Sequence, residues 1–168
     1  MTRLRGAGGR PSGEETRADT RTQAMQNWHD LATTSHYQTA VAVKDALHDG
    51  DTANALEGLE ELIDALARSE RRALRSQLIR LMQHVVKWQL QPDRHSWSWV
   101  ATIRNARREI ADIQQETPSL TRQVLEAMWD DCLAAARDAA AGEMNRPVPP
   151  LTLTWDEVFT TEYTREEE

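Results

Sequence analysis

The sequence predicts an all-α fold, a helical bundle of four main helices with a long second helix and a short C-terminal helix. The 168 residues include only seven glycines and six prolines, while helix-favouring alanine, leucine, arginine, glutamate and glutamine are abundant. Apolar residues recur at alternating spacings of three and four, the period of a helix with one buried face. No segment keeps the period-two alternation of a strand.

The domain organisation follows from the distribution of apolar residues. Residues 1–22 hold almost no large apolar side chain, so we expect a disordered N-terminal tail. Residues 23–161 are expected to form one helical bundle domain, and the acidic residues 162–168 are expected to fray.

The cellular location follows from cysteine content and hydropathy. Cys132 is the only cysteine, so no internal disulfide can form, which indicates a reducing compartment. No apolar run approaches the ~20 residues that span a bilayer. The basic residues 1–10 lack the apolar core of a secretory signal. We therefore expect a soluble cytoplasmic protein that does not contact a membrane.

The first predicted helix covers residues 24–48, with Gly50 able to adopt the left-handed conformation after its end. The second begins at Asn54, as N-cap, and stops at Leu90 before Pro92. Its apolar positions form one stripe in each half, and each stripe is expected to be buried. These positions are Leu56, Leu59, Ile63 and Leu66, then Leu74, Leu78, Leu81, Val85 and Trp88.

Glu70 occupies the stripe position between the two halves, where the register shifts by four as in a coiled-coil stutter. We expect its carboxylate to point inward, and a buried carboxylate needs a cationic partner. Arg68, Arg71 and Arg72 are close enough in sequence to supply one. Glu70 and Arg71 are therefore assigned a structural role in an internal ion-pair layer.

Three more helices are predicted after Pro92. Ser96 or Ser98 would cap the third, whose stripe is Trp99, Ile103, Ala106, Ile110 and Ile113 and which Thr117–Pro118 ends. Ser119 would cap the fourth, whose inner face is Leu125, Met128, Cys132, Ala135 and Ala139. Thr154 and Glu157 have the spacing of a capping box and would open a short final helix.

Charge is distributed unevenly along the chain. Residues 65–108 carry ten arginines and lysines against two acidic residues, whereas the whole chain has a net charge of −7. The excess could be neutralised internally by acidic helices, or it could serve a phosphate-bearing or acidic partner.

The richest part of this basic segment is the corner between the second and third helices. Its candidate binding residues are His84, Lys87, Arg94, His95, Trp97, Arg104 and Arg107. Trp88 and Trp99 are assigned to the core, and Trp97, His95 and Arg94 are expected to be the more exposed residues. Three interpretations remain open: a purely structural corner, a nucleic-acid site in which arginines contact phosphates and Trp97 stacks on a base, and a catalytic site with His84 as general base.

Catalytic chemistry finds little support in the spacing of residues. The five histidines form no pair with ligand-like spacing to an acidic residue or cysteine, so no metal and no cofactor are expected. Neither a Gly-rich phosphate loop nor a nucleophile elbow is present. Cys132 lies on an apolar stripe, which indicates an inert core thiol, and no catalytic residue is assigned.

Several motifs resemble the bacterial domain-of-unknown-function 29 family. They are the runs 66–72, 84–92 and 96–103, then Arg107, Ile110, the run 117–120 and the final run 154–158. The resemblance extends from about Trp28 to Phe159 and implies an all-helical bundle without an established activity. Ala67 departs from the glycine that the family tends to have there, and Leu62 departs from its paired acids.

The sequence thus favours a non-enzymatic module that binds a partner through the basic corner between His84 and Arg108. The partner would be an acidic protein or a second copy of the chain. A nucleic-acid-binding or processing protein is the alternative.

Overall fold

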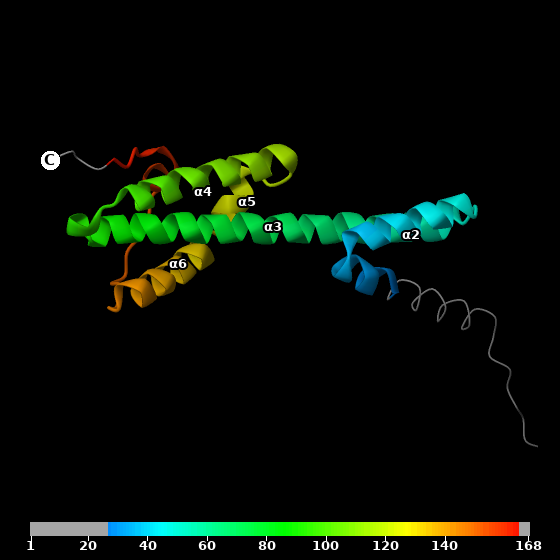
Figure 1. The fold of residues 1–168 in the computed structure, drawn as a ribbon, viewed down its shortest axis with the longest axis horizontal. Coiled ribbons are helices and arrows are strands. Elements are labelled where there is room, and N and C mark those ends of the chain that lie inside the picture. Colours follow the sequence, from blue (N-terminus) through cyan, green and yellow to red (C-terminus); the bar gives the residue numbers. More distant parts are fainter. Residues whose placement is uncertain (1–26, 165–168) are drawn as a thin grey trace, which may run out of the picture. The chain divides into compact units, whose positions relative to one another are not determined.

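The computed structural model describes residues 27–164, and within them the protein is all-α without a strand (Figure 1). A helical segment at 27–34 precedes the elements α2 (His36–His48), α3 (Thr52–Leu90), η1 (Pro92–Arg94), α4 (Trp97–Glu116), α5 (Arg122–Ala127), α6 (Trp129–Met144) and η2 (Asp156–Thr160). The predicted bundle with a long helix and a short C-terminal helix is confirmed. The predicted tail at 1–22 and the last four residues lie outside the described part.

The described chain divides into two compact units, residues 27–67 (unit 1) and residues 68–164 (unit 2). Their boundary falls inside α3, so a single helix contributes its first half to unit 1 and its second half to unit 2. The assignment of 23–161 to one bundle domain stays a prediction. Although α3 has 39 residues, neither it nor another helix within 27–164 is apolar enough over sufficient length to cross a membrane.

In unit 1 the continuous helix predicted for residues 24–48 is wrong, because the chain breaks at Ser35. Ser35 has an extended backbone, with φ −156° and ψ 106°, and its hydroxyl accepts a hydrogen bond from the Gln38 amide to cap α2. Thr34 donates its hydroxyl proton to the Asp30 carbonyl. Hydroxyl side chains compete for backbone groups in this way, which favours a helix start over a helix interior.

The turn between α2 and α3 confirms one expectation and corrects another. Gly50 has φ 79°, the left-handed conformation predicted for it. The N-cap of α3 is Asp51 rather than Asn54, because the Asp51 carboxylate accepts the Asn54 amide proton. The Asn54 side chain instead accepts a hydrogen bond of 2.8 Å from the Trp28 indole. A tertiary contact has therefore replaced the predicted local one.

Unit 1 has a small core. Trp28, Val43 and Ala55 are buried, with Leu31, Ala42 and Ala46 packed against them. Gly58 allows the Trp28 ring to lie directly on α3, since a Cβ there would be 2.8 Å from ring carbons. The stripe from Leu56 to Leu66, predicted to be buried, is exposed instead.

Unit 2 contains the main core. In it the second half of α3 packs with α4 and α6, which flank it in Figure 1. The predicted stripe of α3 is confirmed from Leu74 to Val85, and Trp88 is partly buried at its end. Alpha4 begins as predicted, with the Ser96 hydroxyl accepting a proton from the Trp99 amide. Ile103, Ala106 and Ile110 on its predicted stripe are buried.

The predicted fourth helix is two helices, α5 and α6, with Met128 between them at φ −103° and ψ 4°. Thr121 holds the N-cap position, so the cap predicted at Ser119 is wrong. The break shifts the inner face by one residue. Cys132, Leu133, Ala136 and Ala140 are buried, rather than the predicted Ala135 and Ala139.

The C-terminal segment forms the predicted capping box. The Glu157 carboxylate accepts protons from the Thr154 amide and hydroxyl, and the Thr154 hydroxyl accepts the Glu157 amide proton. The helix that follows is a single π turn. Fraying of residues 162–168 does not extend to Tyr163, which is 8% exposed and donates its hydroxyl proton to the Glu157 carbonyl.

Candidate functional site

Lys87, a predicted binding residue, lies in the interior of unit 2 and is only 5% exposed. Its Nζ lies 2.5 Å from the Glu143 carboxylate on α6 and 4.8 Å from the ring centre of Trp99. Gln83 donates a second hydrogen bond to the same carboxylate. A buried ammonium is tolerated when an anion and an aromatic face replace its water, so Lys87 links α3 to α6 and α4.

His84 lies beside this pair. Its Nδ1 is 2.9 Å from the Arg80 carbonyl, and its Nε2 is 3.5 Å from the Lys87 ammonium. Burial lowers the pKa of His84 below its ordinary value, and the neighbouring charge of Lys87 adds to that effect. A neutral imidazole that donates from Nδ1 and turns its Nε2 lone pair to the ammonium fits both distances.

The Glu143 carboxylate is held ionised by the same cluster. The hydrogen bond from Lys87 is the main cause that lowers its pKa, and the bond from Gln83 contributes further. His84, Lys87 and Glu143 therefore form an interhelical ion-pair cluster whose polar atoms already have partners. The arrangement positions helices, and little of the Lys87 side chain, which is 5% exposed, faces solvent.

His95, expected to be exposed, is instead half-buried against Trp88. The two rings are stacked at 3.6 Å, and the His95 Nε2 lies 2.8 Å from the Trp88 carbonyl. The edge of Tyr163 meets the same indole at 5.3 Å. Trp88 is partly buried and packs against the core of unit 2, and the contacts of His95 hold the η1 turn against the end of α3.

Arg107, another predicted binding residue, anchors the C-terminal segment. Its guanidinium donates hydrogen bonds to the carbonyls of Glu157, Val158 and Thr161 at 2.8 to 3.3 Å. The same group lies 5.5 Å from the ring centre of Tyr163. Burial lowers the pKa of Arg107 from its ordinary value. Carbonyls at a helix end need donors, and a planar guanidinium can supply several at once.

The remaining candidates lie on the exposed side of α4 and on η1. Trp97 is 53% exposed. Arg94 and Arg104 are exposed, and neither side chain makes a hydrogen bond or ion pair to another residue between 27 and 164. Spacings of seven and four place Trp97, Arg104 and Arg108 on one helix face. Arg108 contacts the neighbouring Asn105 side chain.

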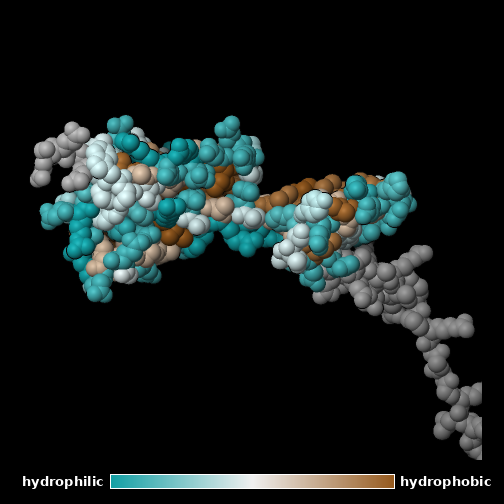
Figure 2. All heavy atoms as spheres, viewed as in Figure 1, coloured by the Kyte–Doolittle hydropathy of each residue, from teal (hydrophilic) through white to brown (hydrophobic). Residues whose placement is uncertain are grey.

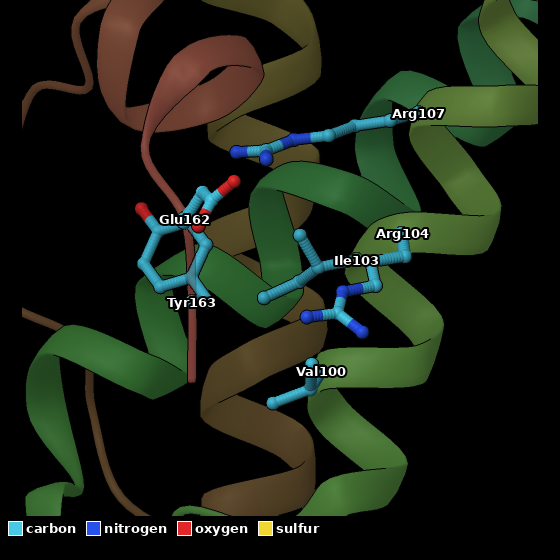
Figure 3. Close-up of a pocket in the computed structure, with 6 residues that line it drawn as sticks. All are labelled: Val100, Ile103, Arg104, Arg107, Glu162 and Tyr163. Atoms are coloured by element: carbon cyan, nitrogen blue, oxygen red, sulfur yellow. The ribbon is translucent and has the colours of Figure 1, made fainter. Parts of the chain in front are cut away.

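A cavity of about 160 Å³ opens beside this face (Figure 3). Val100 and Ile103 supply its apolar wall, and Arg104 and Arg107 extend from α4 toward Glu162 and Tyr163. The volume accommodates several waters or one side chain. Arg107 already donates to backbone carbonyls and Glu162 supplies a carboxylate, so among the six lining residues only Arg104 has a guanidinium that is free to bind an anion.

The ion-pair layer predicted around Glu70 is not formed in the described structure. Glu70 is half-buried, Arg71 is exposed, and no ion pair joins Glu70 to Arg68, Arg71 or Arg72. Arg72 donates to the backbone carbonyl of Arg68 instead. Arg68, Arg71 and Arg72 are all exposed to solvent.

The described residues contain neither a cluster of metal ligands nor an exposed thiol. Between residues 27 and 164 no group of three histidine, cysteine, aspartate or glutamate side chains could hold a metal ion. Cys132 is fully buried, and burial raises the pKa of its thiol. A buried thiol with a raised pKa is a poor nucleophile.

Three residues of this region escaped sequence reasoning. Glu143 pairs with Lys87 across 56 residues, Arg146 donates to the Leu90 carbonyl at the end of α3, and Tyr163 packs on Trp88. Only for Glu143 does the sequence hold a signal that could have predicted its contact, because it lies at the end of an alanine-rich helix face. Small residues let a neighbouring helix pack closely, so an acidic side chain beside them can reach a group on that helix.

Fold and site together define an all-helical domain whose polar corner mainly fastens its own helices. Residues 38–164 match the family described as "Domain of unknown function DUF29", and the chain belongs to that family. No curated protein and no solved structure matches the chain.

Proposed function

We propose that the chain is a non-enzymatic module that binds an acidic protein partner through the exposed side of α4 and the η1 turn. The binding surface consists of Arg94, Trp97, Arg104 and Arg108, and we call it the α4 face. The observation that carries the proposal is the 53% exposure of Trp97 beside Arg94 and Arg104, which have no partner among residues 27–164.

The chemistry of these side chains fits a protein interface. Tryptophan and arginine are the residue types that most often dominate binding energy. Arginine recognises carboxylates through two parallel hydrogen bonds, and an exposed indole gains from removal from water. Arg104 lines a cavity of about 160 Å³, where its guanidinium would receive one carboxylate of the partner.

The surface is smaller than the corner between His84 and Arg108 that the sequence indicated. His84, Lys87, His95 and Arg107 serve internal contacts. Fewer exposed cationic side chains therefore remain to bind a phosphate backbone, for which affinity grows with each neutralised phosphate. The smaller number of available cations favours an acidic protein over a nucleic acid as the partner. As part of the same proposal, we place the module in the bacterial cytoplasm, where its one thiol would stay reduced.

Fluorescence anisotropy with the full chain tests this proposal. The probes are a labelled Asp/Glu-rich peptide and a labelled single-stranded oligonucleotide, each titrated at low salt. We expect the acidic peptide to bind, and we expect Trp97→Ala or Arg104→Gln to weaken it by about tenfold, as for a residue worth more than 1 kcal/mol.

Arg71→Gln is the matched control, because it removes one exposed arginine away from the α4 face. It should change the affinity little, since an isolated surface charge contributes mainly to long-range attraction. Equal losses with Arg71→Gln and Arg104→Gln would show nonspecific charge attraction and would contradict the proposal. Salt-dependent binding of the oligonucleotide alone would establish the nucleic-acid alternative in its place.

A further inference from the structure

The first half of α3 presents an exposed apolar stripe in unit 1. Leu56, Leu59, Ile63 and Leu66 are 55%, 42%, 55% and 42% exposed. Their spacings of three, four and three place them along one face of the helix. Figure 2 shows the apolar atoms as a continuous ridge along this part of α3. Scattered exposed leucines are ordinary, but a contiguous row marks an interaction surface.

The stripe is not the face that α3 uses inside unit 1. The buried positions of this half are the small residues Ala55, Gly58 and Ala65. Gly58 receives the Trp28 ring, and Ala55 belongs to the same small cluster. Alpha3 therefore packs within unit 1 mainly through its small residues, with Leu62 partly buried beside them, and leaves the four stripe residues about half exposed.

Charge indicates what kind of partner would cover the stripe. Residues 27–67 contain one lysine, Lys44, and eight acidic residues: Asp30, Asp45, Asp49, Asp51, Glu57, Glu60, Glu61 and Asp64. Glu60 and Asp64 lie one turn apart on the helix that bears the stripe, both exposed and without an ion pair within 27–164. A field of this sign attracts cations and repels a second copy of itself.

We propose that this stripe is the docking surface for an amphipathic helix of a partner protein whose apolar face is edged by lysines or arginines. The partner's apolar side chains would pack between those of Leu56, Leu59, Ile63 and Leu66, as helices do in a groove. Its cations would meet Glu60 and Asp64. The site lies in unit 1 and is separate from the α4 face, so either proposal can fail without the other.

The full chain is tested against a synthetic helical peptide with leucines at spacings of three and four and lysines on its other face. A peptide of the same composition in shuffled order is the control probe. We expect only the amphipathic peptide to bind. The double variant Leu59→Gln with Ile63→Gln should lose at least about tenfold in affinity, because two central contacts disappear.

Tyr37→Gln is the matched control for the apolar contacts. Tyr37 is 79% exposed on α2 and is not part of the stripe, so its variant should bind as the parent chain does. Because the substituted side chains of the double variant are exposed, circular dichroism should show an unchanged fold. A double variant that binds as tightly as the parent would overturn the proposal.

The charge requirement has its own variant, Glu60→Gln with Asp64→Asn. We expect it to weaken the lysine peptide several-fold, and we expect the loss to shrink as salt rises from about 50 to about 500 mM. Equal binding of a glutamate version of the peptide would overturn the proposal. Self-association of the free chain would also overturn the proposal if the Leu59→Gln, Ile63→Gln variant no longer self-associates. In that case a second copy of the chain would occupy the stripe.

Discussion

Units 1 and 2 share one helix, yet they bury very different amounts of apolar surface. In unit 2 eighteen buried residues form one apolar cluster, whereas the buried apolar cluster of residues 27–67 in unit 1 contains three. Large aliphatic side chains of α3 are fully buried in unit 2, and comparable side chains are about half exposed in unit 1. Since burial of apolar area is the dominant favourable contribution to folding, unit 2 should be stable alone and unit 1 marginal.

The largest expected effect compares one substitution at two sites of the same helix. Leu78→Ala, at a fully buried site in unit 2, should cost about 3 kcal/mol of unfolding free energy because it leaves a cavity. Leu59→Ala, in unit 1, should cost about 0.5 kcal/mol because its side chain is already half in water. Urea unfolding followed by circular dichroism measures both. Similar losses at the two sites would show that the stripe is covered in solution.

A smaller effect tests how tightly unit 1 is packed. In Gly58→Ala the new Cβ would lie 2.8 Å from the Trp28 ring, so the indole must shift. We expect a loss of about 1–2 kcal/mol, after the better helix propensity of alanine is included. Hydrogen exchange should accelerate in residues 27–67 and stay unchanged in residues 68–164.

Gly142→Ala in α6 is the matched control, since no atom lies within 4 Å of the Cβ that it adds. It should stabilise the protein slightly, by about 0.5 kcal/mol, through helix propensity alone. A Gly58→Ala variant that is equally stabilised would mean that Trp28 does not rest on α3.

The smallest expected effect is a decrease in the stability of unit 2 as the pH falls. Burial lowers the pKa of His84 below its ordinary 6.5, so between those two values the unfolded chain binds more protons than the folded one. Stability should therefore fall as pH drops below about 6.5, by less than about 1 kcal/mol for a half-exposed ring. His84→Gln should remove this step in urea unfolding at a series of pH values. If the stability of the His84→Gln variant depends on pH as that of the parent chain does, His84 is free to protonate in the folded state.

A second acid-dependent step should remain in the His84→Gln variant. Lys87 lowers the pKa of Glu143 below its ordinary 4.5, so the stability it contributes is complete above 4.5 and is lost as pH falls through the folded value. Glu143→Gln should abolish this lower step, measured by urea unfolding at the same series of pH values.

Local signals in the sequence predicted much of the fold. The helical period located the long helix and its end before Pro92, and Ser96, Gly50 and the Thr154–Glu157 pair were identified as cap residues. Each of these features depends on residues within about one helical turn of each other. The periodic stripe of unit 2 was also predicted, because burial there agrees with the local pattern.

The rest depends on contacts between distant residues. Nothing near Lys87 in sequence indicates Glu143, and nothing near Arg107 indicates the carbonyls of 157–161. The same limit explains the error at Leu56–Leu66. A helical period shows that side chains share a face, but it does not show whether another element covers that face.

The buried thiol of Cys132 can report transient unfolding of unit 2. It is the one cysteine in the sequence, and it lies fully buried in the core of unit 2. Since the thiol reacts only as an exposed thiolate, its rate of alkylation under native conditions should measure how often unit 2 opens. Loosening confined to unit 1 would leave that rate unchanged, so the natural sequence already carries a label that can distinguish the two units.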